Sequence, residues 1–154
     1  MANEMRGKNR LFLPTFNRAI MVVNITKILL ADDDEDDQFM FLEALKEIEL
    51  PTKLVTANDG DQLMAALRTS TGNLPDVVFL DLNMPRKNGF QCLREIRDDK
   101  ELSALRTIIF STSAEPEVIR QLYKNGADLY IKKPNEFNEL KKIIETVLRR
   151  GVFS

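Results

Sequence analysis

The sequence predicts an α/β fold in which a doubly wound, five-stranded parallel sheet carries helices on both faces. Short apolar runs alternate along the chain with segments of helical periodicity, which is typical of parallel strands joined by crossover helices. The apolar runs end in acidic, hydroxyl or lysine residues, and the carboxyl ends of parallel strands share the edge at which such sheets bind ligands. The 154 residues suffice for one domain.

The composition excludes several classes of function. The 22 Lys and Arg residues oppose 24 Asp and Glu residues, and the net charge of −2 does not favour nucleic acid or membranes as partners. The chain has no histidine, which excludes a Ser-His-Asp or Cys-His relay, a His-containing zinc site and a histidine general base within it. The single cysteine, Cys92, fits a reducing, cytoplasmic compartment and is expected to be a small buried residue on a helix.

The first part of the chain differs from the rest. In residues 1–25, four basic residues oppose one glutamate and no strand or helix pattern develops. We expect 1–25 to be an N-terminal extension, either flexible or the product of a misassigned start, with Met21 as the alternative first residue, and a transit peptide is a further alternative. Residues 26–150 form the domain, and 151–154 are a C-terminal tail.

The first predicted strand, 27–31, runs directly into the acidic residues 32–37. Asp34 and the acidic residues after it are expected to cap the following helix, because carboxylates are favourable at a helix N-terminus. Asp32 and Asp33 come at the end of the strand and are expected at the ligand-binding edge. The spacing also matches part of a calcium-binding EF-hand loop, but that loop requires a glycine at its sixth position, where this chain has Asp37.

The next elements are a helix, a strand and a second helix. The helix is predicted over 38–50 from the apolar spacing of Phe39, Leu42, Leu45 and Ile48, and Pro51 ends it. Residues 53–57 form a strand, Asn58-Asp59-Gly60 a turn, and the following helix carries Leu63, Met64 and Leu67.

The central strand begins at Val77 and ends near Leu82, because Pro85 cannot extend a sheet ladder and Asn88-Gly89 favours a turn. This places Asp81 at the carboxyl end of a strand buried on both faces. A helix follows, with Phe90, Leu93 and Ile96 inward and Arg94 and Arg97 outward.

Two more strand and helix pairs complete the sheet. Strand 107–110 ends in Ser111-Thr112-Ser113, and its helix begins at Pro116 and ends at Gly126. Strand 128–131 ends in Lys132-Lys133-Pro134. The last helix, 136–149, has an inner face of Phe137, Leu140, Ile143, Ile144, Val147 and Leu148.

Three carboxylates, those of Asp32, Asp33 and Asp81, are thus expected at one sheet edge, where they repel one another unless a cation neutralises them. Oxygen ligands without His or Cys suit Mg²⁺. The lysines after the last strand place a fixed cation at the same edge, as a dianionic group beside Asp81 requires.

These residues together resemble the receiver domain of bacterial two-component response regulators over about residues 26–150. The resemblance is carried by Ala31-Asp32-Asp33, Asp81-Leu82-Asn83-Met84-Pro85 with Gly89, Ser111, Tyr130 and Lys133-Pro134. It implies the flavodoxin-like strand order 2-1-3-4-5.

The resemblance also implies roles for these residues. Asp81 would be the phosphoacceptor, taking a phosphoryl group from the phosphohistidine of a sensor histidine kinase or histidine phosphotransfer protein. Asp33, Asp81 and the main-chain carbonyl of Asn83 would hold Mg²⁺, with Asp32 helping, partly through water. Lys133 would pair with a phosphoryl oxygen, aimed by a cis Lys133-Pro134 bond.

By the same resemblance, Ser111 would be the hydroxyl that moves toward the phosphoryl group, with Thr112 as the alternative, and Tyr130 the aromatic switch. Asn83 and Ser113 occupy positions that tune hydrolysis in the family.

The chain ends with its fifth helix, so we expect a signalling domain without an attached output domain. It would assist its own phosphotransfer and dephosphorylation without being an enzyme, act in a phosphorelay on a downstream protein target, and be a monomer or a phosphorylation-dependent dimer. DNA binding through the basic leader or Arg149-Arg150 lacks a recognition helix. The alternative is a phosphatase or phosphotransferase with Asp81 as nucleophile, but such enzymes need a second aspartate where Asn83 stands.

Overall fold

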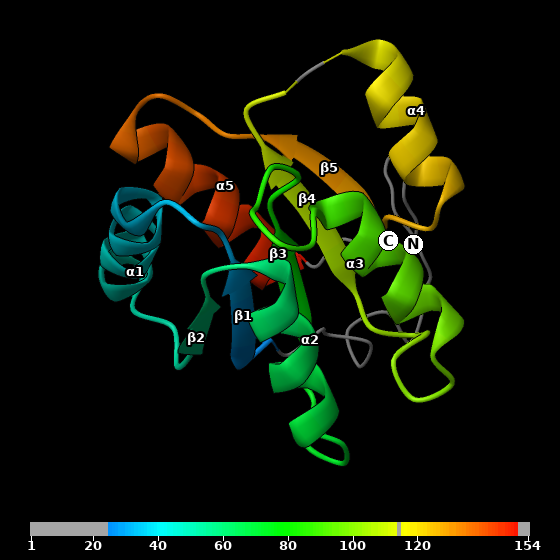
Figure 1. Ribbon diagram of the computed structural model, residues 1–154. Coiled ribbons are helices and arrows are strands. Elements are labelled where there is room, and N and C mark those ends of the chain that lie inside the picture. Colours follow the sequence, from blue (N-terminus) through cyan, green and yellow to red (C-terminus); the bar gives the residue numbers. More distant parts are fainter. Residues whose placement is uncertain (1–24, 114, 151–154) are drawn as a thin grey trace, which may run out of the picture.

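The computed structural model describes residues 25–113 and 115–150, which form a five-stranded parallel sheet flanked by five helices (Figure 1). The strands lie in the order β2-β1-β3-β4-β5, so the expected fold class and strand order are confirmed. Their bounds are β1 (Lys27–Ala31), β2 (Lys53–Ala57), β3 (Val77–Leu80), β4 (Thr107–Ser111) and β5 (Leu129–Lys132). The sheet order reverses direction next to β1, which makes the carboxyl ends of β1 and β3 the switch point of the fold.

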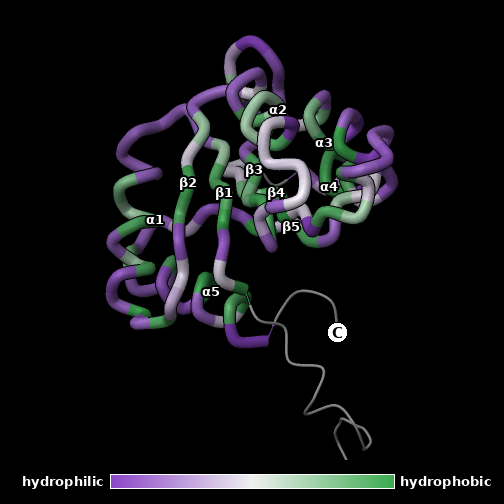
Figure 2. The backbone as a smooth tube through the Cα atoms, turned by 90° about the horizontal axis from the view of Figure 1, so that it is seen from below, coloured by the Kyte–Doolittle hydropathy of each residue, from purple (hydrophilic) through white to green (hydrophobic). Residues whose placement is uncertain are grey.

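The helices cover both faces of the sheet. They are α1 (Glu35–Ile48), α2 (Gly60–Thr69), α3 (Gly89–Asp98), α4 (Pro116–Lys124) and α5 (Phe137–Arg150). One buried cluster lies between the sheet and α2, α3 and α4, and a second lies between the sheet and α1 and α5 (Figure 1). Hydrophobic residues accordingly concentrate in the central strands, whereas loops are hydrophilic (Figure 2). No helix within the described part of the chain is long and apolar enough to cross a membrane.

The α1 and α5 side of the core is built around three phenylalanine rings. Phe41 of α1 contacts Phe79 of β3 at 5.0 Å and Phe110 of β4 at 6.1 Å between ring centroids, in both cases edge to face. Such pairs add about 1 kcal/mol each beyond the burial of their area. This cluster fixes α1 over the strands whose ends carry the carboxylates.

The predicted start of α1 was wrong, and of the apolar positions used to predict it Leu45 and Ile48 are buried but Phe39 and Leu42 are not. The helix begins at Glu35, three residues before the predicted start, because Asp34 is its N-cap and accepts hydrogen bonds from the main-chain amides of Asp36 and Asp37. Phe39 and Leu42 are 58% and 38% exposed. The buried positions are Phe41, Ala44, Leu45 and Ile48. These follow the i, i+3, i+4, i+7 spacing of a helix stripe, whereas repeated steps of three residues drift off that stripe.

Arg97 on α3 does not point outward as predicted, although Arg94 does. The Arg97 guanidinium donates hydrogen bonds to the carbonyls of Gly126 at 2.9 Å and Leu105 at 2.7 Å, and pairs with Asp128 at 3.0 Å. Its apolar stem lies close to Gly126, where an added Cβ would meet the Arg97 side chain at 2.9 Å. Arg97 therefore ties α3 to the loops before β4 and β5.

Cys92 is fully buried on α3, as predicted. Its thiol contacts the main-chain carbonyl of Gly60 at 3.8 Å, and a Cβ at Gly60 would lie 2.8 Å from the sulfur. Burial raises the pKa of the Cys92 thiol to about 12. At the start of the domain, Ile25 is buried in the core beneath α1 and α5, although the sequence assigned it to the leader. The rest of the leader, residues 1–24, and the tail, 151–154, lie outside the described residues.

Candidate functional site

The ends of β1 and β3 bring the predicted carboxylates together. Ala31 and Leu80 are paired in the sheet, so Asp32 and Asp81 are the next residues of neighbouring strands. The Asp81 amide donates to the Ala31 carbonyl at 3.0 Å, and the Asp32 amide donates to the Ala57 carbonyl at 3.0 Å. One carboxylate oxygen from each of Asp32, Asp33 and Asp81 lies within 4.8 Å of the other two. Asp32 and Asp81 are buried, whereas Asp33 is exposed.

The loop after β3 is folded tightly beneath Asp81. The amide of Gly89, the first residue of α3, donates to the Leu82 carbonyl at 2.9 Å. An added Cβ at Gly89 would lie 2.5 Å from the Asp81 main-chain oxygen, so only glycine permits this approach. The start of α3 and the Asp81 backbone are therefore packed as one unit, which fixes the direction of the carboxylate.

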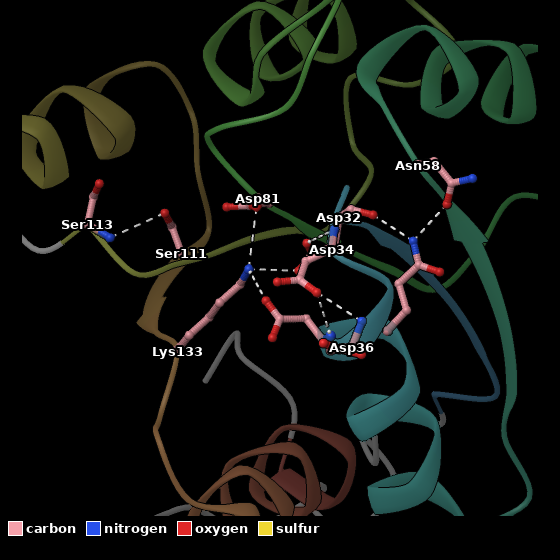
Figure 3. A network of polar contacts seen from close by, with 10 residues as sticks. Asp32, Asp34, Asp36, Asn58, Asp81, Ser111, Ser113 and Lys133 are labelled. Atoms are coloured by element: carbon pink, nitrogen blue, oxygen red, sulfur yellow. Dashed lines mark hydrogen bonds and ion pairs between the residues drawn. The ribbon is translucent and has the colours of Figure 1, made fainter.

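Lys133, which follows β5, reaches this edge from the other side (Figure 3). Its ammonium lies 2.7 Å from Asp32, 2.9 Å from Asp37 and 3.4 Å from Asp81. Its main-chain amide donates to the Ser111 carbonyl at 2.9 Å, which anchors the residue to the end of β4.

The expected cis bond between Lys133 and Pro134 is wrong, because the described chain contains no cis peptide bond. The trans form is the intrinsically more stable isomer. The side chain of Lys133 is long enough to bring its ammonium to the three carboxylates from the trans backbone.

One ammonium cannot neutralise the carboxylates that surround it. Burial raises the pKa of Asp32 to about 6, although hydrogen bonding and charge from Lys133 oppose the shift. Burial likewise raises the pKa of Asp81, against the pull of Lys133. Burial works to lower the pKa of Lys133, but its contacts with Asp32 and Asp37 outweigh that effect and hold the pKa above its usual value. The site is therefore short of positive charge.

Asp32 shows this shortage most directly. Its Oδ1 accepts a hydrogen bond from the Asp34 amide at 3.0 Å. Its Oδ2, although 2.7 Å from the Lys133 ammonium, has no well-aligned hydrogen-bond donor among the described residues. A buried carboxylate oxygen facing two further carboxylates fits a hard divalent cation with oxygen ligands.

The predicted switch residues lie on β4 and β5. Ser111 is fully buried at the end of β4, and its hydroxyl accepts a hydrogen bond from the Ser113 amide at 3.4 Å, whereas Thr112 is exposed. Tyr130 on β5 is half-buried against the core, and its hydroxyl has no partner within the part of the chain that the structure describes. Asn83 is exposed beside Asp81.

Two residues of α1 that were not predicted contact the site. Asp37, assigned only to helix capping, pairs with Lys133. The Gln38 side-chain amide donates to the Asp32 carbonyl at 2.6 Å and to the Asn58 side chain at 2.8 Å. The only signal in the sequence was position: the first turn of a helix that starts at a ligand-binding edge faces that edge.

Comparisons with known proteins agree with this geometry. The response regulator receiver domain family matches residues 28–145. Response regulator Rcp1 of Synechocystis is 27% identical over 124 residues, which cover 78% of this chain and 84% of Rcp1. Among solved structures, a phosphorylated cyanobacterial phytochrome response regulator, RcpA, is 32% identical with a TM-score of 0.73, covering 80% of this chain and 91% of that one.

A second solved structure bears on the carboxylates. The Mn²⁺-bound form of Rcp1 is 26% identical to this chain with a TM-score of 0.71, and the match covers 79% of this chain and 91% of that one. Family, fold and the placement of the buried aspartates at the switch point thus agree. The chain belongs to the response regulator receiver domain family.

Proposed function

We propose that Asp81 is the phosphoacceptor of this receiver domain. The observation that carries the proposal is a buried carboxylate at the switch point of the sheet, 3.4 Å from a buried ammonium and within 4.8 Å of two further carboxylates. A carboxylate in this position can act as a nucleophile toward phosphorus, while fixed charges around it stabilise the transferring group.

The proposed donor is a phosphohistidine, as the receiver family suggests, and it must belong to a partner protein because this chain has no histidine. One oxygen of the Asp81 carboxylate attacks phosphorus, and the new P–O bond forms as the P–N bond to the imidazole breaks. The electron pair of that bond stays on the imidazole nitrogen. Lys133 donates to an equatorial oxygen of the transferring group, which lowers the energy of the charge that develops there.

The proposed cofactor is Mg²⁺, held by Asp33, Asp81 and the main-chain carbonyl of Asn83, with Asp32 assisting. The Oδ2 atom of Asp32, which lacks a well-aligned hydrogen-bond donor, and the cluster of carboxylates within 4.8 Å support a divalent cation. Bound there, the ion would neutralise the carboxylates and the phosphoryl oxygens.

We propose Ser111 as the switch hydroxyl, with Tyr130 as the aromatic that responds to it. Ser111 is buried at the strand end and Thr112 is exposed, which favours Ser111. The unpaired hydroxyl of Tyr130 gives that ring a reason to move when a new acceptor or space becomes available. Asn83 and Ser113 are proposed to tune hydrolysis from positions flanking the phosphoryl group.

The partner that carries the phosphohistidine is a sensor histidine kinase or a phosphotransfer protein, and α1 offers it a surface. Phe39 and Leu42 are exposed apolar residues on the helix whose first turn contacts Lys133. Exposed apolar side chains beside a reactive group mark a contact surface for a protein partner. A buried free thiol at Cys92 suits the reducing cytoplasm in which such partners have their catalytic domains.

Intact mass after incubation with acetyl phosphate tests the proposal, with and without Mg²⁺. The native chain should gain one phosphoryl group only with Mg²⁺, and Asp81→Asn should gain none. Asp76→Asn, at the opposite edge of the sheet, is the matched control and should still be labelled. If the native chain stays unmodified by both acetyl phosphate and a phosphorylated partner, the proposal is wrong.

The alternative is an enzyme that hydrolyses phosphomonoesters through an aspartyl phosphate. Asn83 stands where such an enzyme needs an acid-base carboxylate and cannot transfer a proton. We expect one phosphoryl group per chain and no multiple turnover of a small phosphomonoester. Sustained release of phosphate from that substrate would favour the enzyme instead.

A further inference from the structure

Asp37 is a carboxylate of the site that the proposed function does not use. It lies in the first turn of α1, and its Oδ2 is 2.9 Å from the Lys133 ammonium. Asp81, the proposed acceptor, is farther from the same ammonium, at 3.4 Å. Lys133 is therefore held more closely by Asp37 than by the group beside which it is meant to act.

Helix capping does not account for this contact. Asp34 already caps α1 by accepting from the amides of Asp36 and Asp37. Glu35 and Asp36 supply negative charge to the same helix end. Packing of α1 against α5 is secured by the buried cluster they share and by the Lys141–Glu47 pair at 3.2 Å. If the Asp37 carboxylate faced solvent, α1 would still be capped and would still pack against α5.

Three carboxylates surround the Lys133 ammonium. It donates hydrogen bonds to Asp37 at 2.9 Å and to Asp81 at 3.4 Å, and it forms an ion pair with Asp32 at 2.7 Å. A phosphoryl oxygen that approaches the ammonium therefore competes with these carboxylates for it. The Asp37 side chain is 40% exposed, against 1% for Asp32 and 9% for Asp81. If the ammonium moves away from one carboxylate, water can solvate Asp37 more readily than the buried Asp32 or Asp81.

We propose that Asp37 is a positioning residue that holds Lys133 in the unphosphorylated site and is exchanged for a phosphoryl oxygen when Asp81 is modified. This inference rests on the proposed function. Because Asp37 competes with the incoming phosphoryl group for the Lys133 ammonium, it slows phosphorylation by small anionic donors. Asp37 thereby makes the site less responsive to free acyl phosphates.

The test compares the rate of phosphoryl gain from acetyl phosphate, in Mg²⁺, for the native chain, Asp37→Asn and Asp36→Asn. Asp36 is the matched control, because its substitution removes the same charge one residue away without touching Lys133. Asp37→Asn should react about threefold to fivefold faster than the native chain, as expected for loss of one partly exposed ion pair. Asp36→Asn should change the rate by less than about twofold, because its charge is screened.

A double-mutant cycle separates positioning from a general structural effect. Combined with Lys133→Gln, Asp37→Asn should no longer accelerate the reaction, because the residue acts through the ammonium. The acceleration should also shrink in high salt. Circular dichroism checks that each variant is folded.

Equal rates for Asp37→Asn and Asp36→Asn, with the native chain labelled at Asp81, overturn this inference alone. An acceleration that survives in the Lys133→Gln background also overturns it. A native chain that takes no phosphoryl group overturns the proposed function, and this inference with it.

Discussion

The two edges of the sheet both carry aspartates, but they use them in opposite ways. At the amino edge, Asp76 precedes β3 and accepts hydrogen bonds from the Thr26 amide at 2.8 Å, the Thr26 hydroxyl at 3.2 Å and the Lys27 amide at 2.9 Å. At the carboxyl edge, Asp32 and Asp81 face each other across one shared ammonium. Hydrogen bonds to main-chain amides lower the pKa of Asp76 despite partial burial, whereas burial raises the pKa of both site aspartates.

Asp128 plays the same part between β4 and β5 that Asp76 plays between β1 and β3. It precedes β5, accepts from the Thr107 amide at 2.8 Å and pairs with Arg97. In both places an aspartate before one strand holds the first residue of a neighbouring strand. A carboxylate whose oxygens accept hydrogen bonds from the main chain stabilises the fold. A buried carboxylate with too few donors destabilises the fold slightly, and a cation that binds to it removes that cost.

The largest expected effect is at the amino edge. Asp76→Ala removes three hydrogen bonds and leaves two main-chain amides without their acceptor, so it should lower the free energy of unfolding by about 3 kcal/mol. Urea denaturation measures it. Asp76→Asn keeps an acceptor oxygen in place and should lose only about 1 kcal/mol. A loss from Asp76→Ala as small as that from Asp76→Asn would contradict the comparison.

The next largest expected effect is a difference between the two edges in how stability depends on pH. Without divalent cations, folded Asp32, with a pKa of about 6 against 3.8 in the unfolded chain, binds its proton more tightly than the unfolded chain does. Its contribution to stability therefore falls as pH rises from about 4 to about 6, by about 2 kcal/mol. Asp76, whose pKa is lowered, contributes in the opposite sense, because its stabilisation is lost as pH falls below 3.8.

Denaturation curves in EDTA at several pH values check these slopes. The loss between pH 4 and 6 should become smaller in Asp32→Asn, where the raised pKa of Asp81 still contributes, and should persist in full in Asp76→Asn. An identical slope in Asp32→Asn and the native chain would show that Asp32 is not the group that titrates.

A smaller effect should follow from adding the cation. Mg²⁺ at ten times its dissociation constant should raise the free energy of unfolding at neutral pH by about 1.4 kcal/mol. Asp33→Asn, which alters the carboxyl edge, should lose this gain, and Asp36→Asn should keep it. Thermal denaturation with and without Mg²⁺ measures both. An equal gain in Asp33→Asn would place the cation elsewhere.

The smallest expected effect is at Asp128. Asp128→Asn keeps an acceptor for the Thr107 amide and loses only the charge paired with Arg97, so it should cost less than about 1 kcal/mol. Phosphorylation by acetyl phosphate should be unchanged in the same variant. An asparagine side chain is thus expected to preserve stability at the amino edge. At Asp81, the same substitution should abolish phosphorylation.

The sheet was predictable because each strand is short, apolar and followed by a distinct turn or polar residue. The placement of Asp32, Asp33, Asp81 and Lys133 at one edge followed from strand order alone, since parallel strands end together. The register of α1 was not predictable in the same way. Its acidic first turn concealed the start of the helix, and the exposed Phe39 and Leu42 mimicked an inner face.

Contacts made by long side chains were also beyond the sequence. Arg97 occupies a helix position that periodicity marks as outward, but its guanidinium turns back to three main-chain carbonyls. Asp37 was assigned to capping because capping and site residues share the same composition at a helix N-terminus. In both cases the partner belongs to a distant loop, which no local pattern specifies.

The sealed thiol of Cys92 has a practical consequence. A buried sulfur with a pKa of about 12 holds almost no thiolate at neutral pH, so the folded chain should not react with maleimides. A cysteine introduced at an exposed position such as Lys124 on α4 would then be the single reactive thiol. Fluorophores or spin labels can be attached there without first removing a native cysteine, so distances on α4 can be followed.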